Sequence, residues 1–184
     1  LILTCSSEIP NIRKIQKILE HVIKSNRSLL MVAPVSQSVK SALMMNKVKG
    51  NIKINIIDPP GFGPTKKDAI EDLAVLTGAT VLNEELGDDL DLMKPEHLGE
   101  AEFSVTDDKT TVVTLEGMTQ DIENRIDEVN KKLSTEKDGF IKKKLEQRLA
   151  MLSGSVGIIN VGANSKVELK EKKDRVEDAI CATK

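Results

Sequence analysis

Aromatic residues are nearly absent from this 184-residue chain, which contains three Phe, no Trp and no Tyr. Proteins that bind single-stranded nucleic acid stack bases on aromatic rings, so the composition argues against that class. A strong positive field is absent as well, because 27 Lys and Arg residues nearly balance 29 Asp and Glu residues. The overall charge of −2 therefore predicts neither a nucleic-acid partner nor a membrane partner.

Cysteine is equally scarce, and Cys5 and Cys181 lie near opposite ends of the sequence. Two distant cysteines form neither a disulfide framework nor a metal-binding spacing, so we expect free thiols in a reducing compartment. His21 and His97 have no carboxylate or cysteine at ligand spacing, so no metal site is predicted. No apolar run approaches the ~20 residues that a membrane-spanning helix needs.

Strand and helix patterns alternate along the first half of the chain, which predicts a mixed α/β fold. The predicted helices cover 9–26, with Ser7 as N-cap and Asn26 as the stop, 38–49 and 65–77. The predicted strands cover the first residues, 29–33, 52–57 and 80–82. A looser segment over 83–101 then precedes a β-hairpin formed by 103–105 and 110–115.

Two long polar helices follow, and their apolar stripes predict an antiparallel helical hairpin that turns at 135–139. The stripes consist of Ile122, Ile126, Val129 and Leu133 in one helix and of Ile141, Leu145, Leu149 and Leu152 in the other. Beyond them the sequence predicts a strand over 156–161 and a charged helix from about Val167.

The helix over 38–49 carries apolar side chains on two opposite faces. At 100° per residue, Val39 and Leu43 face one way, whereas Met44, Met45 and Val48 face the other. One face can pack on a sheet, and the other needs a second layer of core or stays exposed. Because Met is unbranched and polarizable, an exposed face of this kind suits many different apolar partners.

The first helix has an apolar arc of roughly 140°, which is wider than a single core contact requires. Its Leu19–Ile23 edge could border the outer face of the second helix. The two helices together therefore predict an apolar groove. The arc consists of Ile12, Ile15, Ile18, Leu19, Val22 and Ile23.

Four motifs occur in an order and spacing that resemble the group I chaperonins across essentially the whole chain. The motifs are Pro60-Gly61-Phe62-Gly63, then Leu76-Thr77-Gly78-Ala79-Thr80-Val81, then Leu145-Glu146-Gln147-Arg148-Leu149-Ala150 with Leu152-Ser153-Gly154, and the run KEKKDRVEDA over 170–179. The resemblance implies an apical, polypeptide-binding domain over 1–156 that lacks its first strands. It also implies a β-sandwich flanked by helices and, over 157–184, the start of the returning intermediate-domain segment. The sequence is then expected to be a piece of a longer ring subunit.

The resemblance further implies that the groove binds non-native polypeptides and, in turn, a co-chaperonin ring. The residues expected to line it are Ile15, Leu19, Ile23, Met44, Met45 and Val48. Gln16 and Lys40 stand where the family usually has Leu, which predicts a more polar or differently selective groove. Identical subunits would complete the ring, in a mitochondrial or plastid matrix or in a bacterial cytoplasm.

Asp178 matches the family's aspartate that orients the attacking water at ATP, so the resemblance assigns it a catalytic role in the full-length protein. ATP and Mg would bind a domain outside this sequence, and the chain by itself is expected to hold no cofactor. From its glycines, the segment over 153–157 is predicted to form a hinge at Gly154 and Gly157.

Two other functions are compatible with the sequence. An adaptor could use the helical hairpin over 118–153 to bind a coiled-coil partner. A small-molecule enzyme would instead need a pocket of convergent polar groups.

Overall fold

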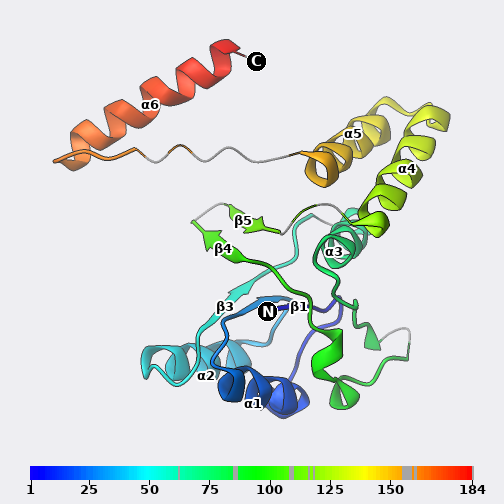
Figure 1. Ribbon diagram of the computed structural model, residues 1–184, viewed down its shortest axis with the longest axis vertical. Coiled ribbons are helices and arrows are strands. Elements are labelled where there is room, and N and C mark those ends of the chain that lie inside the picture. The colour runs from blue at the N-terminus through cyan, green and yellow to red at the C-terminus, as the bar shows by residue number, and fades with distance from the viewer. Residues whose placement is uncertain are drawn as a thin grey trace. The chain divides into compact units, whose positions relative to one another are not determined.

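The computed structural model describes residues 1–61, 63–84, 87–107, 110–115, 117, 119–154, 159 and 161–183 (Figure 1). The chain divides into two compact units, Leu1–Gly154 and Ser155–Lys184. The first unit contains both sheets, and the second contains α6 (Lys166–Thr183). None of the helices in the described part of the chain combines the length and the apolar character needed to cross a membrane.

A three-stranded parallel sheet forms the centre of the first unit. Its strands β1 (Ile2–Thr4), β2 (Leu29–Val32) and β3 (Ile54–Ile57) lie in that order across the sheet. Every residue of β1 and β2 is buried, as expected for parallel strands that are covered on both faces. The predicted strand over 80–82 is reduced to one parallel bridge between Leu82 and Cys5.

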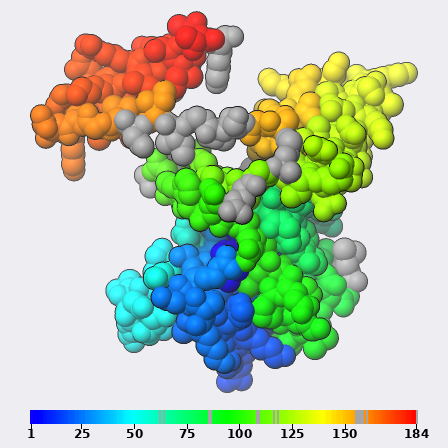
Figure 2. Space-filling model, viewed as in Figure 1, coloured from blue at the N-terminus to red at the C-terminus, as the bar shows by residue number. Residues whose placement is uncertain are grey.

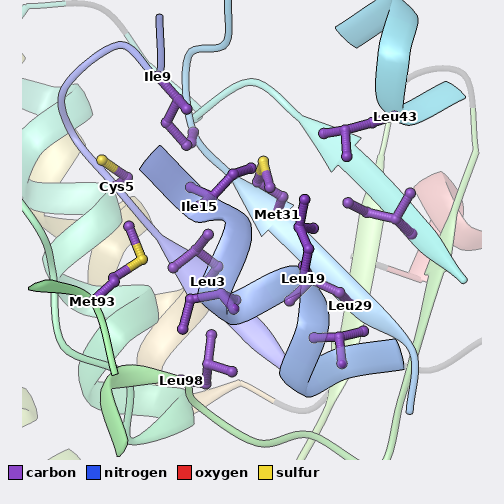
Figure 3. Packing of buried hydrophobic residues seen from close by; sticks show 14 of the residues in the cluster. Leu3, Cys5, Ile9, Ile15, Leu19, Leu29, Met31, Leu43, Met93 and Leu98 are labelled. Atoms are coloured by element: carbon purple, nitrogen blue, oxygen red, sulfur yellow. The ribbon is translucent and has the colours of Figure 1, made fainter. Parts of the chain in front are cut away.

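Two helices pack against one face of this sheet. The first, α1 (Gln16–Ser25), follows a 3₁₀ turn, η1 (Ile12–Ile15), and the second is α2 (Gln37–Val48). Right-handed crossovers between neighbouring parallel strands place successive helices on the same side. Figure 3 shows Ile15 and Leu19 of the first helical segment and Leu43 of α2 in one cluster with Leu29 and Met31 of β2.

The first helical segment begins later than predicted, and Ser7 is not its N-cap. Ile9 forms a parallel bridge with Val35, which keeps the chain extended up to Pro10. The Asn11 side chain instead accepts a hydrogen bond from the Arg13 backbone N–H at 3.0 Å. Asn26 ends α1 as predicted, in the left-handed conformation at φ 53°.

The opposite face of the sheet is covered by α3 (Pro64–Thr77) and by the hairpin of β4 (Phe103–Thr106) and β5 (Thr111–Thr114). Leu73 of α3 and Val113 of β5 pack against the strands, beside Ile2, Leu30 and Val32. The connecting segment over 83–101 contains the short turns η3 (Leu90–Leu92) and η4 (Pro95–His97). The mixed α/β fold class is confirmed.

The predicted helical hairpin is confirmed as α4 (Gln120–Thr135) and α5 (Gly139–Ser153). Asp138 caps α5, because its carboxylate accepts hydrogen bonds from the backbone N–H groups of Phe140 and Ile141. Val129, Leu145 and Leu152 form the buried contact of the hairpin. Most of the strand predicted over 156–161 lies outside the described residues.

The two cysteines should differ sharply in reactivity. Cys5 is fully buried, and burial raises the pKa of its thiol to about 11, whereas Cys181 is exposed. Since the thiolate is the reactive form, an alkylating reagent at pH up to about 9 should modify Cys181 alone until the chain is unfolded. Peptide mass spectrometry before and after denaturation measures this; native labelling of Cys5 at a comparable rate would contradict the packing of β1.

Candidate functional site

The outer face of α2 is largely exposed, which is one of the two outcomes that its two-sided pattern allows. Val39 and Leu43 are buried against the sheet, at 2% and 1% exposure. Met45 and Val48 are 60% and 88% exposed. Ser36 fixes the start of the helix, since its hydroxyl accepts a hydrogen bond from the Val39 backbone N–H.

The exposed apolar edge of the first helical segment is narrower than the sequence predicts. Two of the residues expected to line the groove, Ile15 and Leu19, are buried instead. Ile15 is completely buried, so its side chain is not available to a partner. Leu19 is only 9% exposed and belongs to the main core cluster. Both lie at helical spacing with Val22, which is fully buried on the sheet-facing side. Of the six residues in the predicted apolar arc, only Ile23 is exposed, at 52%.

We use the term α1–α2 surface for the predicted groove residues that remain accessible. They are Ile23, Met45 and Val48, which are exposed, and Met44, which is half-buried. Polar side chains accompany them on both helices: Lys40 is exposed, and the exposed Gln16 donates a hydrogen bond to Glu20 at 2.8 Å. When a partner covers exposed apolar side chains of this kind, the free energy of the system falls, which favours binding.

Several cavities lie elsewhere in the first unit, including one of about 630 Å³ beside α3 and α4. A second, of about 490 Å³, is lined by residues that include Leu1, Ile54 and Phe103. A third, of about 500 Å³, lies among the sheet, α3 and β5 and includes Leu73 and Val113. None of these three is lined by a residue of the α1–α2 surface. The candidate site is therefore a surface for an extended partner, in contrast to an enclosed small-molecule pocket.

A buried ion cluster positions the helical hairpin, and no pattern in the sequence indicated it. The carboxylate of Asp72 in α3 accepts hydrogen bonds from Arg148 Nε and Nη2 in α5, at 2.7 and 2.9 Å. It also accepts one from Arg125 Nε in α4, at 2.8 Å. The bond to Asp72 raises the pKa of the Arg148 guanidinium, which therefore stays charged. Arg148 stands within a recognised motif, but its partner lies 76 residues away.

The predicted hinge lies where the first unit ends. Gly154 follows the last residue of α5, and a Cβ there would come within 2.3 Å of the Ala150 carbonyl oxygen. Its backbone φ of −88° is open to any residue, so this close approach is what favours glycine. Gly157 lies outside the described residues. The boundary between the two units falls after Gly154, close to the predicted domain boundary after 156.

Asp178 is exposed on α6. In the part of the chain that the structure describes, no three His, Cys, Asp or Glu side chains come together in a way that could hold a metal ion. A role for this carboxylate in hydrolysis would need phosphate and magnesium ligands from other residues.

Comparison with known proteins agrees with the motifs. Residues 10–184 match the TCP-1/cpn60 chaperonin family. The fold is similar to that of the chaperonin gp146 from the bacteriophage EL 2 (Pseudomonas aeruginosa), crystallised in the presence of ATP-BeFx, with a TM-score of 0.65 and 18% sequence identity. The similarity covers 97% of this chain and 36% of that one, so the chain spans little more than a third of the length of gp146. The resemblance drawn from the sequence is confirmed, and the chain belongs to the TCP-1/cpn60 chaperonin family.

Proposed function

We propose that the α1–α2 surface binds apolar segments of non-native polypeptides and so gives this chain the role of a polypeptide-binding part of a chaperonin subunit. The observation that carries the proposal is the exposure of Ile23, Met45 and Val48 on two helices whose other apolar faces are buried. Unfolded chains expose apolar side chains that folded ones hide, so such a surface recognises the non-native state without reading a particular sequence.

One such surface is a weak binder. Full burial of a Leu- or Met-sized side chain contributes roughly 1.5–3 kcal/mol, and here each exposed side chain would contribute a part of that. A ring of identical subunits would hold one flexible polypeptide at several points, and this linkage converts weak contacts into tight capture. A co-chaperonin that competes for the same surface would release the polypeptide, and rotation of the unit about Gly154 would separate the surfaces.

The experiment measures how much chemically denatured model protein is captured by beads that carry many copies of the 184-residue chain. Replacing Ile23 and Met45 with Ser should lower the captured fraction on the order of tenfold, because the partner loses two apolar contacts. The matched control replaces two apolar residues elsewhere that are more exposed than Ile23 and Met45, namely Phe140 in α5 and Val167 in α6, and should retain capture.

Unchanged capture by the Ile23→Ser/Met45→Ser variant would exclude the α1–α2 surface as the binding site. Equal loss in both variants would show that any exposed apolar residue contributes, which contradicts a defined site. Loss in the control variant alone would favour the adaptor function, in which the partner binds the helical hairpin.

A further inference from the structure

The tip of the helical hairpin concentrates positive charge. Residues 131–144, here called the hairpin tip, contain six lysines and two carboxylates, for a formal charge of +4 in a chain whose total is −2. All six lysines are exposed. They are Lys131, Lys132, Lys137, Lys142, Lys143 and Lys144.

This charge is not neutralised locally. Glu136 Oε1 accepts hydrogen bonds from the backbone N–H groups of Lys137 and Asp138, at 2.8 and 3.0 Å. Asp138 Oδ1 accepts the backbone N–H groups of Phe140 and Ile141, at 2.8 and 3.3 Å. Both carboxylates therefore stabilise the turn, and within the described residues none of the six lysines forms an ion pair.

Two apolar side chains stand among these lysines. Phe140 and Ile141, in the first turn of α5, are 72% and 45% exposed. The Lys144 ammonium lies 5.8 Å from the centre of the Phe140 ring. Figure 1 shows this end of α4 and α5 projecting away from the sheets of the first unit, and Figure 2 shows it, in yellow, as a protrusion of the surface.

The chemistry of the hairpin tip favours one class of partner. Lysines around exposed Phe and Ile fit an anionic bilayer, where the ammonium groups meet phosphates and the apolar side chains enter the acyl boundary. An acidic peptide would pair with the lysines but leave Phe140 and Ile141 in water on a protrusion. A nucleic acid could stack on Phe140, but it gains little from Ile141.

We propose that the hairpin tip docks on anionic phospholipid surfaces. The overall charge of −2 predicted no membrane partner, but an electrostatic contact depends on the charge within about a Debye length, ~10 Å at 0.1 M salt. The contact is peripheral, and it uses residues separate from those of the α1–α2 surface.

The test measures co-sedimentation of the 184-residue chain with vesicles of phosphatidylcholine, either alone or mixed with phosphatidylserine. We expect binding only to the mixed vesicles, weakened by added salt. Replacing Lys142 and Lys143 with Gln should reduce the partition coefficient on the order of tenfold. The matched control, Lys170→Gln/Lys173→Gln in α6, removes two exposed lysines that form no ion pair with any residue that the structure describes, and it should bind like the original chain.

Phe140→Ser should weaken binding at every salt concentration, whereas Phe103→Ser, at another exposed Phe, should not. The proposal is overturned if the mixed vesicles do not bind the chain, if the two lysine pairs have equal effects, or if polyglutamate or single-stranded RNA binds the tip more tightly than the vesicles do. The Ile23→Ser/Met45→Ser variant should bind vesicles normally, so failure of this proposal and failure of the proposed function are distinguishable.

Discussion

Replacing Asp72 with Ala should lower the free energy of unfolding by about 3–5 kcal/mol. The Asp72 side chain is buried at 4% residue exposure, and it accepts three hydrogen bonds from the guanidinium groups of Arg125 and Arg148. Arg148 is itself only 8% exposed. Removal of the carboxylate leaves buried positive charge without its main partner, and desolvation of that charge is no longer compensated.

Denaturant unfolding measures the change, with the midpoint and the slope compared between variants. Glu71→Ala is the matched control, because Glu71 also binds Arg125, at 2.9 Å, but is 53% exposed in its side chain. A surface ion pair of this kind contributes about 0–1 kcal/mol. Similar losses for the two variants would contradict the burial of the Asp72 cluster.

The Asp72 variant should also have a local effect on the hairpin. Asp72 lies in α3, whereas its partners lie in α4 and α5, so the cluster connects three helices. Hydrogen exchange in α4 and α5 should accelerate more than exchange in β2. Arg148→Met in the Asp72→Ala background should restore part of the lost stability, because an apolar side chain leaves no unpaired charge in the core.

Two truncations in α2 should differ strongly in their effect on the free energy of unfolding, although the residues lie only two positions apart. Leu43→Ala should cost about 2–5 kcal/mol of unfolding free energy, because Leu43 is 1% exposed and packs in the main core cluster. Met45→Ala should change stability by less than about 0.5 kcal/mol, because Met45 is 60% exposed and Ala is a strong helix former.

The pair tests the orientation on which the proposed function depends. Denaturant unfolding gives the two free energies, and the polypeptide-capture assay should rank the variants in the reverse order when both are folded. If Met45→Ala lowered the free energy of unfolding by more than about 2 kcal/mol, Met45 would have to be packed in the core. The α1–α2 surface would then not exist in the folded chain.

Several features of the fold follow from the sequence because they depend on local periodicity. The stripe from Ile122 to Leu133 repeats at helical spacing, and any partner helix must meet that side of α4. The two faces of α2 could be assigned in the same way, since 100° per residue separates Leu43 from Met45 without reference to the rest of the chain. The four spaced motifs likewise identified the family.

Other features were decided only by the tertiary structure. The apolar arc over η1 and α1 is continuous, so its periodicity does not indicate where the core ends. The position of the sheet buries Ile15 and Leu19 and leaves Ile23 exposed. Asp72 and Arg148 are 76 residues apart, and their ion pair exists because α3 and α5 pack together. The overall charge of −2 does not indicate the positive charge of the hairpin tip. Its lysines lie close together because α4 and α5 pack antiparallel to each other. The sequence determined which faces of each helix are apolar, and the packing of distant elements determined which of those faces water can reach.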